Sequence, residues 1–120
     1  MAGKVKKVRP AVFFATATGR EPVREWLRGL PEEDRKTIGG DIQALEFGEP
    51  MGLPLVGSFG DGLWEVRVRL SSRRIARVFF MLDGSEMVLL HGFMKKSQKT
   101  PDKEVRLARQ RKRDWENDDD

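Results

Sequence analysis

The alternation of apolar and polar positions divides residues 62–101 into three extended runs. Residues 63–70 alternate between an apolar side and a side that carries Leu63, Glu65, Arg67 and Arg69. Residues 75–82 alternate in the same way, with Arg77 on a side that otherwise carries large apolar residues. Asp83-Gly84 is a strong turn signal, so we predict that residues 86–95 pair antiparallel with residues 75–82.

The last of these runs is apolar on both sides. Strict alternation puts Val88, Leu90, Gly92 and Met94 on one face. The other face then carries Met87, Leu89, His91, Phe93 and, at its basic end, Lys95. Alternation alone does not show which face meets the helices.

The first half of the chain predicts one strand and two helices. Residues 8–16 are rich in β-branched and aromatic side chains, which favours a strand. Residues 21–30 carry an apolar stripe at helical spacing. A second helix begins at Pro31 and ends before Gly48, and Gly39-Gly40 predicts a kink or a weak spot within it. Residues 51–61 contain too many glycines and prolines for regular structure and predict a loop.

A basic segment, residues 95–100, leads to a last helix that starts at Pro101. In that helix Trp115 is expected to pack back on the sheet. The length of 120 residues fits a single domain, residues 1–120, with residues 1–7 and 116–120 expected to be disordered. We expect the two helices of the first half of the chain to form a hairpin that covers the sheet.

Composition removes several classes of function. The chain has no cysteine and one histidine, which excludes disulfides, thiol nucleophiles and multi-histidine metal sites, and we expect neither metal nor cofactor. No apolar run approaches the roughly 20 residues of a membrane span, and the basic N-terminus lacks an apolar signal core. We therefore expect a cytoplasmic protein that does not contact a membrane.

Positive charge is concentrated in one part of the chain. Residues 1–61 carry nine basic and nine acidic side chains, whereas residues 62–115 carry fourteen basic and six acidic ones. An excess of this size is typical of a surface that binds phosphates, although a solvated basic face without a partner accounts for it equally well.

The polar side of the predicted sheet has the groups needed to cleave a phosphodiester in RNA. Arginines hold phosphate oxygens in pairs, Glu65 is a candidate base, and His91 or a lysine of lowered pKa is a candidate acid. Each has a simpler interpretation: Glu65 in a surface ion pair, His91 as a half-buried structural residue. Arg77 is harder to explain in this way, because an unpaired charge in an apolar strand is costly and implies a partner or ligand.

The segments GLWEVRV, ARVFF and VLLHGFMKKSQKTP, followed by a basic helix, resemble the RelE/HigB-like toxins of bacterial type II toxin–antitoxin modules, in particular the phage-derived branch related to HigB. The resemblance extends over most of the chain, including EPVREWLRGLPEEDR. It implies a microbial-ribonuclease-like α+β fold: an antiparallel sheet of about four strands, two helices from the N-terminal half on one face, and a C-terminal helix.

The resemblance also implies a function. Such toxins are endoribonucleases that cut messenger RNA, usually in the ribosomal A site, without a metal. Carried over by position, the catalytic candidates are Glu65, Arg67, Arg77, Lys95 and Lys96. Candidates for RNA binding are Arg69, Arg74, Phe79, His91, Lys99, Arg106 and Arg109. Relatives commonly have a tyrosine where this chain has Phe79-Phe80, and the chain has no tyrosine, so the identity of the general acid stays open.

The implied partners are the ribosome, mRNA and a cognate antitoxin, a helix-turn-helix protein of the HigA kind. Two alternatives remain at this point: a catalytically inactive protein of the toxin fold that binds RNA or an antitoxin, and a phage accessory protein.

Overall fold

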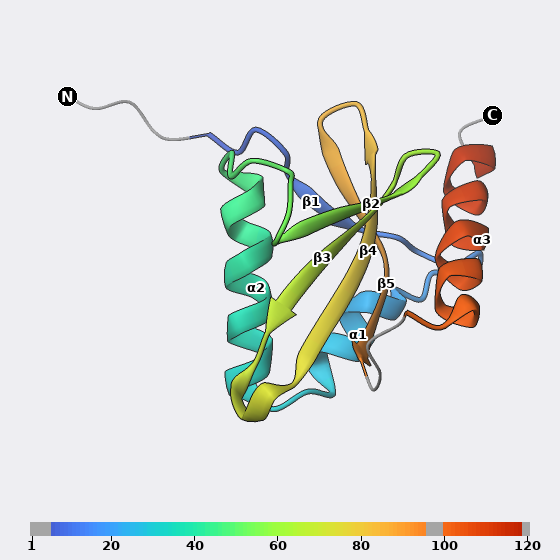
Figure 1. Cartoon of the computed structure of the whole chain (residues 1–120). Helices are drawn as coiled ribbons and strands as arrows, with labels where there is room; N and C mark the ends of the chain where they lie inside the picture. The colour runs from blue at the N-terminus through green and yellow to red at the C-terminus, as the bar shows by residue number, and fades with distance from the viewer. Residues whose placement is uncertain (1–5, 96–99, 119–120) are drawn as a thin grey trace.

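The computed structural model describes residues 6–95 and 100–118, which form an α+β domain with a five-stranded mixed sheet between layers of helix (Figure 1). The elements, in chain order, are β1 (Ala11–Phe13), α1 (Pro22–Arg28), α2 (Glu32–Glu46), β2 (Val56–Gly60), β3 (Leu63–Arg69), the short 3₁₀ turn η1 (Ser71–Arg73), β4 (Ile75–Asp83), β5 (Glu86–Lys95) and α3 (Asp102–Asp118).

The sheet has the strand order β1-β5-β4-β3-β2. Strands β2 to β5 are antiparallel, which confirms the pairing of β4 with β5 that the Asp83-Gly84 turn predicts, but β1 pairs parallel with β5. The expectation of about four antiparallel strands therefore missed one strand and the parallel edge. The extra strand is β2, which lies within the segment predicted to be a loop and pairs with β3 from Val56↔Val66 onward.

The two faces of the sheet have separate cores. Helices α1 and α2 cover one face, where Val23, Ile38 and Leu45 pack against Val66 and Val78. Helix α3 covers the other face, with Ala108 and Trp115 packed against the second core, whose sheet residues include Phe79, Val88 and Leu90. Figure 1 shows α2 and α3 on opposite sides of the twisted sheet. Trp115 packs back on the sheet as expected, and its indole N–H donates to Asp83 Oδ2 at 2.8 Å.

A β-bulge in β5 makes the two faces of that strand differ from those that strict alternation predicts. Phe79 pairs with His91, but Phe80 pairs with Leu89, so Leu90 is an extra residue. The bulge reverses the alternation, which is why His91, Phe93 and Lys95 lie on the α3 face whereas Met87 and Leu89 belong to the α1–α2 core.

The helices and termini also differ in detail from the sequence pattern. Helix α2 runs through Gly39-Gly40 without interruption. Helix α3 continues to Asp118, and Glu116, expected in a disordered tail, is helical and pairs with Lys112 at 2.9 Å. Lys7 of the N-terminal arm pairs with Glu46 at 3.1 Å. Among the described residues, none of the helices is both long and apolar enough to cross a membrane.

Candidate functional site

The three antiparallel strands bring the predicted cationic residues together on the α3 face of the sheet. Arg67 on β3 lies directly opposite Arg77 on β4, and Phe93 on β5 completes this row. Lys95 belongs to the next row, opposite Ile75. Because side chains one row apart on the same face remain within reach of long residues, Arg67, Arg77 and Lys95 converge at one end of the sheet.

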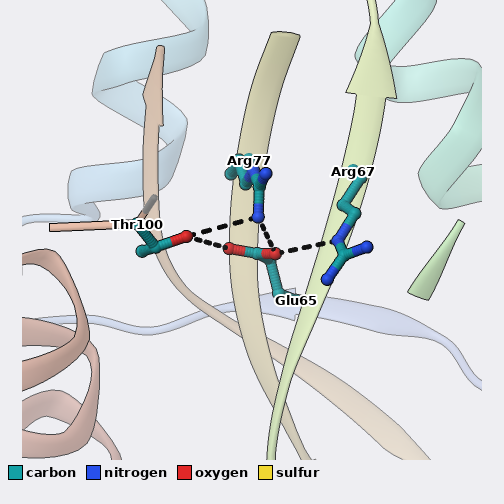
Figure 2. A network of polar contacts seen from close by, with 4 residues as sticks. All are labelled: Glu65, Arg67, Arg77 and Thr100. Atoms are coloured by element: carbon teal, nitrogen blue, oxygen red, sulfur yellow. Dashed lines mark hydrogen bonds and ion pairs between the residues drawn. The ribbon is translucent and has the colours of Figure 1, made fainter. Parts of the chain in front are cut away.

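A carboxylate holds the two arginines in place (Figure 2). Glu65 Oε1 accepts a hydrogen bond from Arg77 Nη1 and another from Arg67 Nε, the latter at 3.2 Å. Thr100, from the segment before α3, completes the network: its Oγ1 lies 3.3 Å from Arg77 Nη1 and 3.5 Å from Glu65 Oε2. Glu65 is therefore the partner that the buried Arg77 requires.

Burial differs sharply among the members of this network. The side chain of Glu65 is 0% exposed and that of Arg77 8%, whereas the side chain of Arg67 is 37% exposed. Arg77 also has a buried Nε without a hydrogen-bond partner among the described residues. The carboxylate thus lies beneath the arginines, and Arg67 is the member most open to a ligand.

Gly57 on β2 makes room for Arg67. A Cβ at position 57 would lie 2.8 Å from Arg67 Nη2, closer than two such atoms can approach. The absence of a side chain therefore lets the guanidinium lie across β2.

An open cleft of about 680 Å³ lies over this network, between the sheet and the start of α3. Among the described residues, four cations line it and Asp102 is the one acid; the described lining residues are Phe59, Arg67, Arg77, Lys95, Thr100, Asp102, Val105 and Arg106. Four basic groups around one concave surface favour an anion, and guanidiniums bind phosphate oxygens in pairs.

Lys95 has a perturbed acidity in this cleft. Desolvation lowers the pKa of its ammonium, the charges of Arg77 and Arg67 lower it further, and Glu65 opposes them. A lysine with a lowered pKa gives up its proton more readily than an ordinary one. Of the two candidate acids in the sequence, Lys95 lines the cleft.

His91 lies elsewhere, under α3. Its Nε2 is 3.2 Å from Glu104 Oε2, its Nδ1 is 3.3 Å from Arg111 Nη1, and its ring stacks on Phe93. Burial lowers the pKa of His91 more than the hydrogen bond from its ring to Glu104 raises it. These contacts give His91 a structural role, because they join α3 to the sheet.

The remaining candidates are divided between the cleft and other places. Arg106 lines the cleft. Arg69 is exposed at the end of β3. Arg74 forms a paired hydrogen bond with Asp34 at 2.7 and 2.8 Å, which fastens η1 to α2. Arg109 donates to the carbonyl of Phe59 at 2.7 Å and ties α3 to β2. Lys96 and Lys99 lie outside the described residues.

Phe79, expected to stack on a base, is 0% exposed in the second core, where it contacts Phe59 and Phe93. Its ring is not available to a ligand in this structure, because strand pairing on both sides and α3 above enclose it. The aromatic residue that does line the cleft is Phe59.

Sequence reasoning missed Phe59, Thr100, Asp102 and Val105 as residues of the cleft. Phe59 belongs to the strand mistaken for a loop, and Thr100 and Asp102 flank Pro101 at the start of α3. The sequence predicted a helix that starts after a basic segment. It did not show that α3 would return over the sheet and cover the arginines. No group of three or more potential metal ligands occurs in residues 6–95 and 100–118.

Comparison with known families gives one match. The family model described as phage derived protein Gp49-like (DUF891) matches residues 25–113. The chain belongs to this Gp49-like family. A search of curated proteins finds no significant match.

The Gp49-like match includes the whole site. It begins within α1 and ends within α3, so it contains every residue that lines the cleft together with the buried Glu65. The cleft is therefore built entirely from the part of the chain that carries the family pattern.

Proposed function

We propose that this Gp49-like protein is the toxin of a toxin–antitoxin module and acts as an endoribonuclease on messenger RNA in the ribosomal A site. The observation that carries the proposal is the cleft in which Arg67, Arg77, Lys95 and Arg106 meet above a buried carboxylate. The family's phage origin agrees with the phage-derived branch of RelE/HigB-like toxins that the sequence resembles.

The cations would hold the scissile phosphate. In cleavage by the RNA itself, the 2′-oxygen attacks phosphorus, and the pentavalent intermediate carries more negative charge than the starting diester. Donors already fixed around that charge stabilise it without reorganisation. Arg67 and Arg77 are fixed in this sense, because Glu65 accepts hydrogen bonds from both.

Each proton transfer in this reaction has a specific donor and acceptor. The proton of the 2′-hydroxyl leaves toward Glu65 as the O2′–P bond forms. The P–O5′ bond breaks, and the leaving oxygen takes a proton from Lys95, whose lowered pKa suits it to an acid. The products are a 2′,3′-cyclic phosphate and a 5′-hydroxyl end.

Phe59 supports a single-stranded substrate. Its ring is half-buried at the wall of a cleft that is otherwise basic. A base stacked on such a ring contributes about 1–3 kcal/mol irrespective of its sequence. We propose Phe59 for the stacking role that the sequence had suggested for Phe79.

The test is brief induction of the protein in a bacterium, with transcript 5′ ends mapped and growth followed. Wild type is expected to arrest growth and create new 5′-hydroxyl ends within codons. Arg67→Ala should relieve both effects, because this exposed guanidinium is lost without stranding a buried charge. Arg28→Ala, an exposed arginine at the end of α1 on the other face, is the matched control and should behave as wild type. Folded, abundant wild-type protein that leaves growth and transcript ends unchanged would refute the proposal.

One observation favours a second function. Glu65 is fully buried and its Oε1 is paired with two arginines, which is an arrangement expected of a carboxylate that positions arginines in a protein that binds RNA or an antitoxin without cleaving it. Such a protein would bind single-stranded RNA with an affinity that falls with salt and would create no new ends.

A further inference from the structure

The buried position of Glu65 raises a question about any reaction in the cleft: how its carboxylate receives a proton from a substrate it does not touch. We propose that the hydroxyl of Thr100 relays the 2′-hydroxyl proton of RNA to Glu65. This inference rests on the proposed ribonuclease function and assigns a catalytic role to Thr100.

Thr100 is the group that connects the cleft to the carboxylate. It lines the cleft, and its Oγ1 lies 3.5 Å from Glu65 Oε2. The other carboxylate oxygen, Oε1, is occupied by Arg77 and Arg67. Among the described residues Thr100 is the hydrogen-bond partner of Oε2 (Figure 2).

Arg77 fixes the direction in which Thr100 donates. A guanidinium has only donors, so the contact of 3.3 Å between Arg77 Nη1 and Thr100 Oγ1 makes the hydroxyl oxygen an acceptor there. The hydroxyl proton is then left for the neighbouring acceptor, Glu65 Oε2. A hydroxyl oxygen has two lone pairs, so one remains for a proton donor in the cleft that Thr100 lines. The hydroxyl is thus oriented to accept a proton from the cleft and to pass its own to the carboxylate.

The step balances. The 2′-hydroxyl proton moves to Thr100 Oγ1 as the proton of Thr100 moves to Glu65 Oε2, the O2′–P bond forms, the P–O5′ bond breaks, and Lys95 protonates O5′. Thr100 ends unchanged, Glu65 protonated and Lys95 neutral. Exchange with water after product release restores both.

The test compares Thr100→Val, which keeps the shape of the side chain without its hydroxyl, with Thr100→Ser, which keeps the hydroxyl. Single-turnover cleavage of a 5′-labelled mRNA on the ribosome measures the reaction. Binding is measured with the same mRNA carrying a 2′-deoxynucleotide at the cleavage position, and melting temperatures check folding. We expect Thr100→Val to cleave about 100-fold more slowly or worse, with binding within about twofold of wild type, because proton transfer by a positioned group contributes about 10²–10⁴-fold. Thr100→Ser should recover most of the rate.

A double variant separates a relay from a merely structural role. If Thr100 acts through Glu65, Thr100→Val adds no further loss in a Glu65→Gln background. If wild type cleaves and Thr100→Val cleaves equally fast, the relay is overturned while the proposed function stands. A loss of RNA affinity in Thr100→Val that matches its loss of cleavage rate would overturn the relay in the same way. So would additive losses of rate in the double variant. A folded wild type that cleaves no ribosome-bound mRNA would overturn the proposed function and the relay with it.

Discussion

At the scale of single residues, the site depends on one buried carboxylate among cations. Arg77 and Glu65 are both removed from water, so each is tolerated only because the other is present. Arg67 adds a second hydrogen bond from a position that solvent reaches. The pair therefore links stability with function: the charge that would bind phosphate also neutralises the charge beneath it.

Arg77→Ala is expected to destabilise the fold by about 3–5 kcal/mol, because it leaves a fully buried carboxylate without its main partner. Arg67→Ala should cost much less, since its side chain is 37% exposed and Arg77 still pairs with Glu65. Urea unfolding followed by circular dichroism measures both.

A double variant controls this prediction. Removing both charges, as in Glu65→Gln with Arg77→Met, should be less destabilising than Arg77→Ala, because no buried charge is left unpaired. Equal stability of Arg77→Ala and Arg67→Ala would contradict this account of the site.

At the scale of elements, the path of strand β5 determines which of its side chains lie on each face of the sheet. Its bulge at Leu90 turns His91, Phe93 and Lys95 toward α3 and leaves Gly92 facing α1. A Cβ at Gly92 would lie 2.4 Å from Cε3 of Trp26, so the indole of α1 packs directly on the strand backbone. This contact fixes α1 against the sheet.

Gly92→Ala is accordingly expected to destabilise the protein by about 1–3 kcal/mol, since a rigid ring and a strand backbone must separate to admit the methyl group. Gly39→Ala is the matched control: nothing lies within 4 Å of its Cβ, and it occupies the interior of α2, so it should stabilise by about 1 kcal/mol. Urea unfolding measures both variants. A Gly92→Ala protein as stable as wild type would show that α1 is not held by this contact.

The sequence predicted those elements whose signals are local. Strands β3 to β5 follow from alternation and the Asp83-Gly84 turn, and α1, α2 and α3 from their apolar stripes. Strand β2 has no alternation of its own and exists through its pairing with β3. The parallel pairing of β1 and the bulge in β5 are likewise set by distant partners, and the run of apolar residues 87–90 fits either register.

The residues of the site also divide into those with a local signal in the sequence and those placed by distant parts of the chain. Arg67 and Arg77 were both candidates from the sequence, because Arg67 lies on the polar side of its strand and a charge at Arg77 among large apolar residues implies a partner. Thr100 was not a candidate, because its contact with Glu65 depends on the path by which the chain returns from β5 to α3. The burial of Phe79 likewise depends on α3 covering that face.

At the scale of the whole molecule, the two faces of the sheet have different tasks. The α1–α2 face is closed by an apolar core, and the first half of the chain, which supplies both helices, carries no net charge. The α3 face combines a smaller core with the basic cleft, and the four described cations of the cleft all come from the basic part of the chain, residues 62–115. Binding of a polyanion should therefore depend on where a charge lies and not only on the net charge.

Salt dependence of binding tests this division. Affinity for a single-stranded, uncleavable 2′-deoxy oligonucleotide should fall with salt, with a slope of log affinity against log salt of about −0.7 per phosphate contact. Lys95→Gln should make the slope shallower by about 0.7, because it removes one cation from the cleft. Lys36→Gln removes the same charge from the exposed side of α2, where Lys36 pairs with Glu32 at 3.1 Å, and should leave the slope unchanged. Fluorescence anisotropy over a salt series measures the three proteins. If both variants change the slope equally, net charge governs binding and the cleft does not.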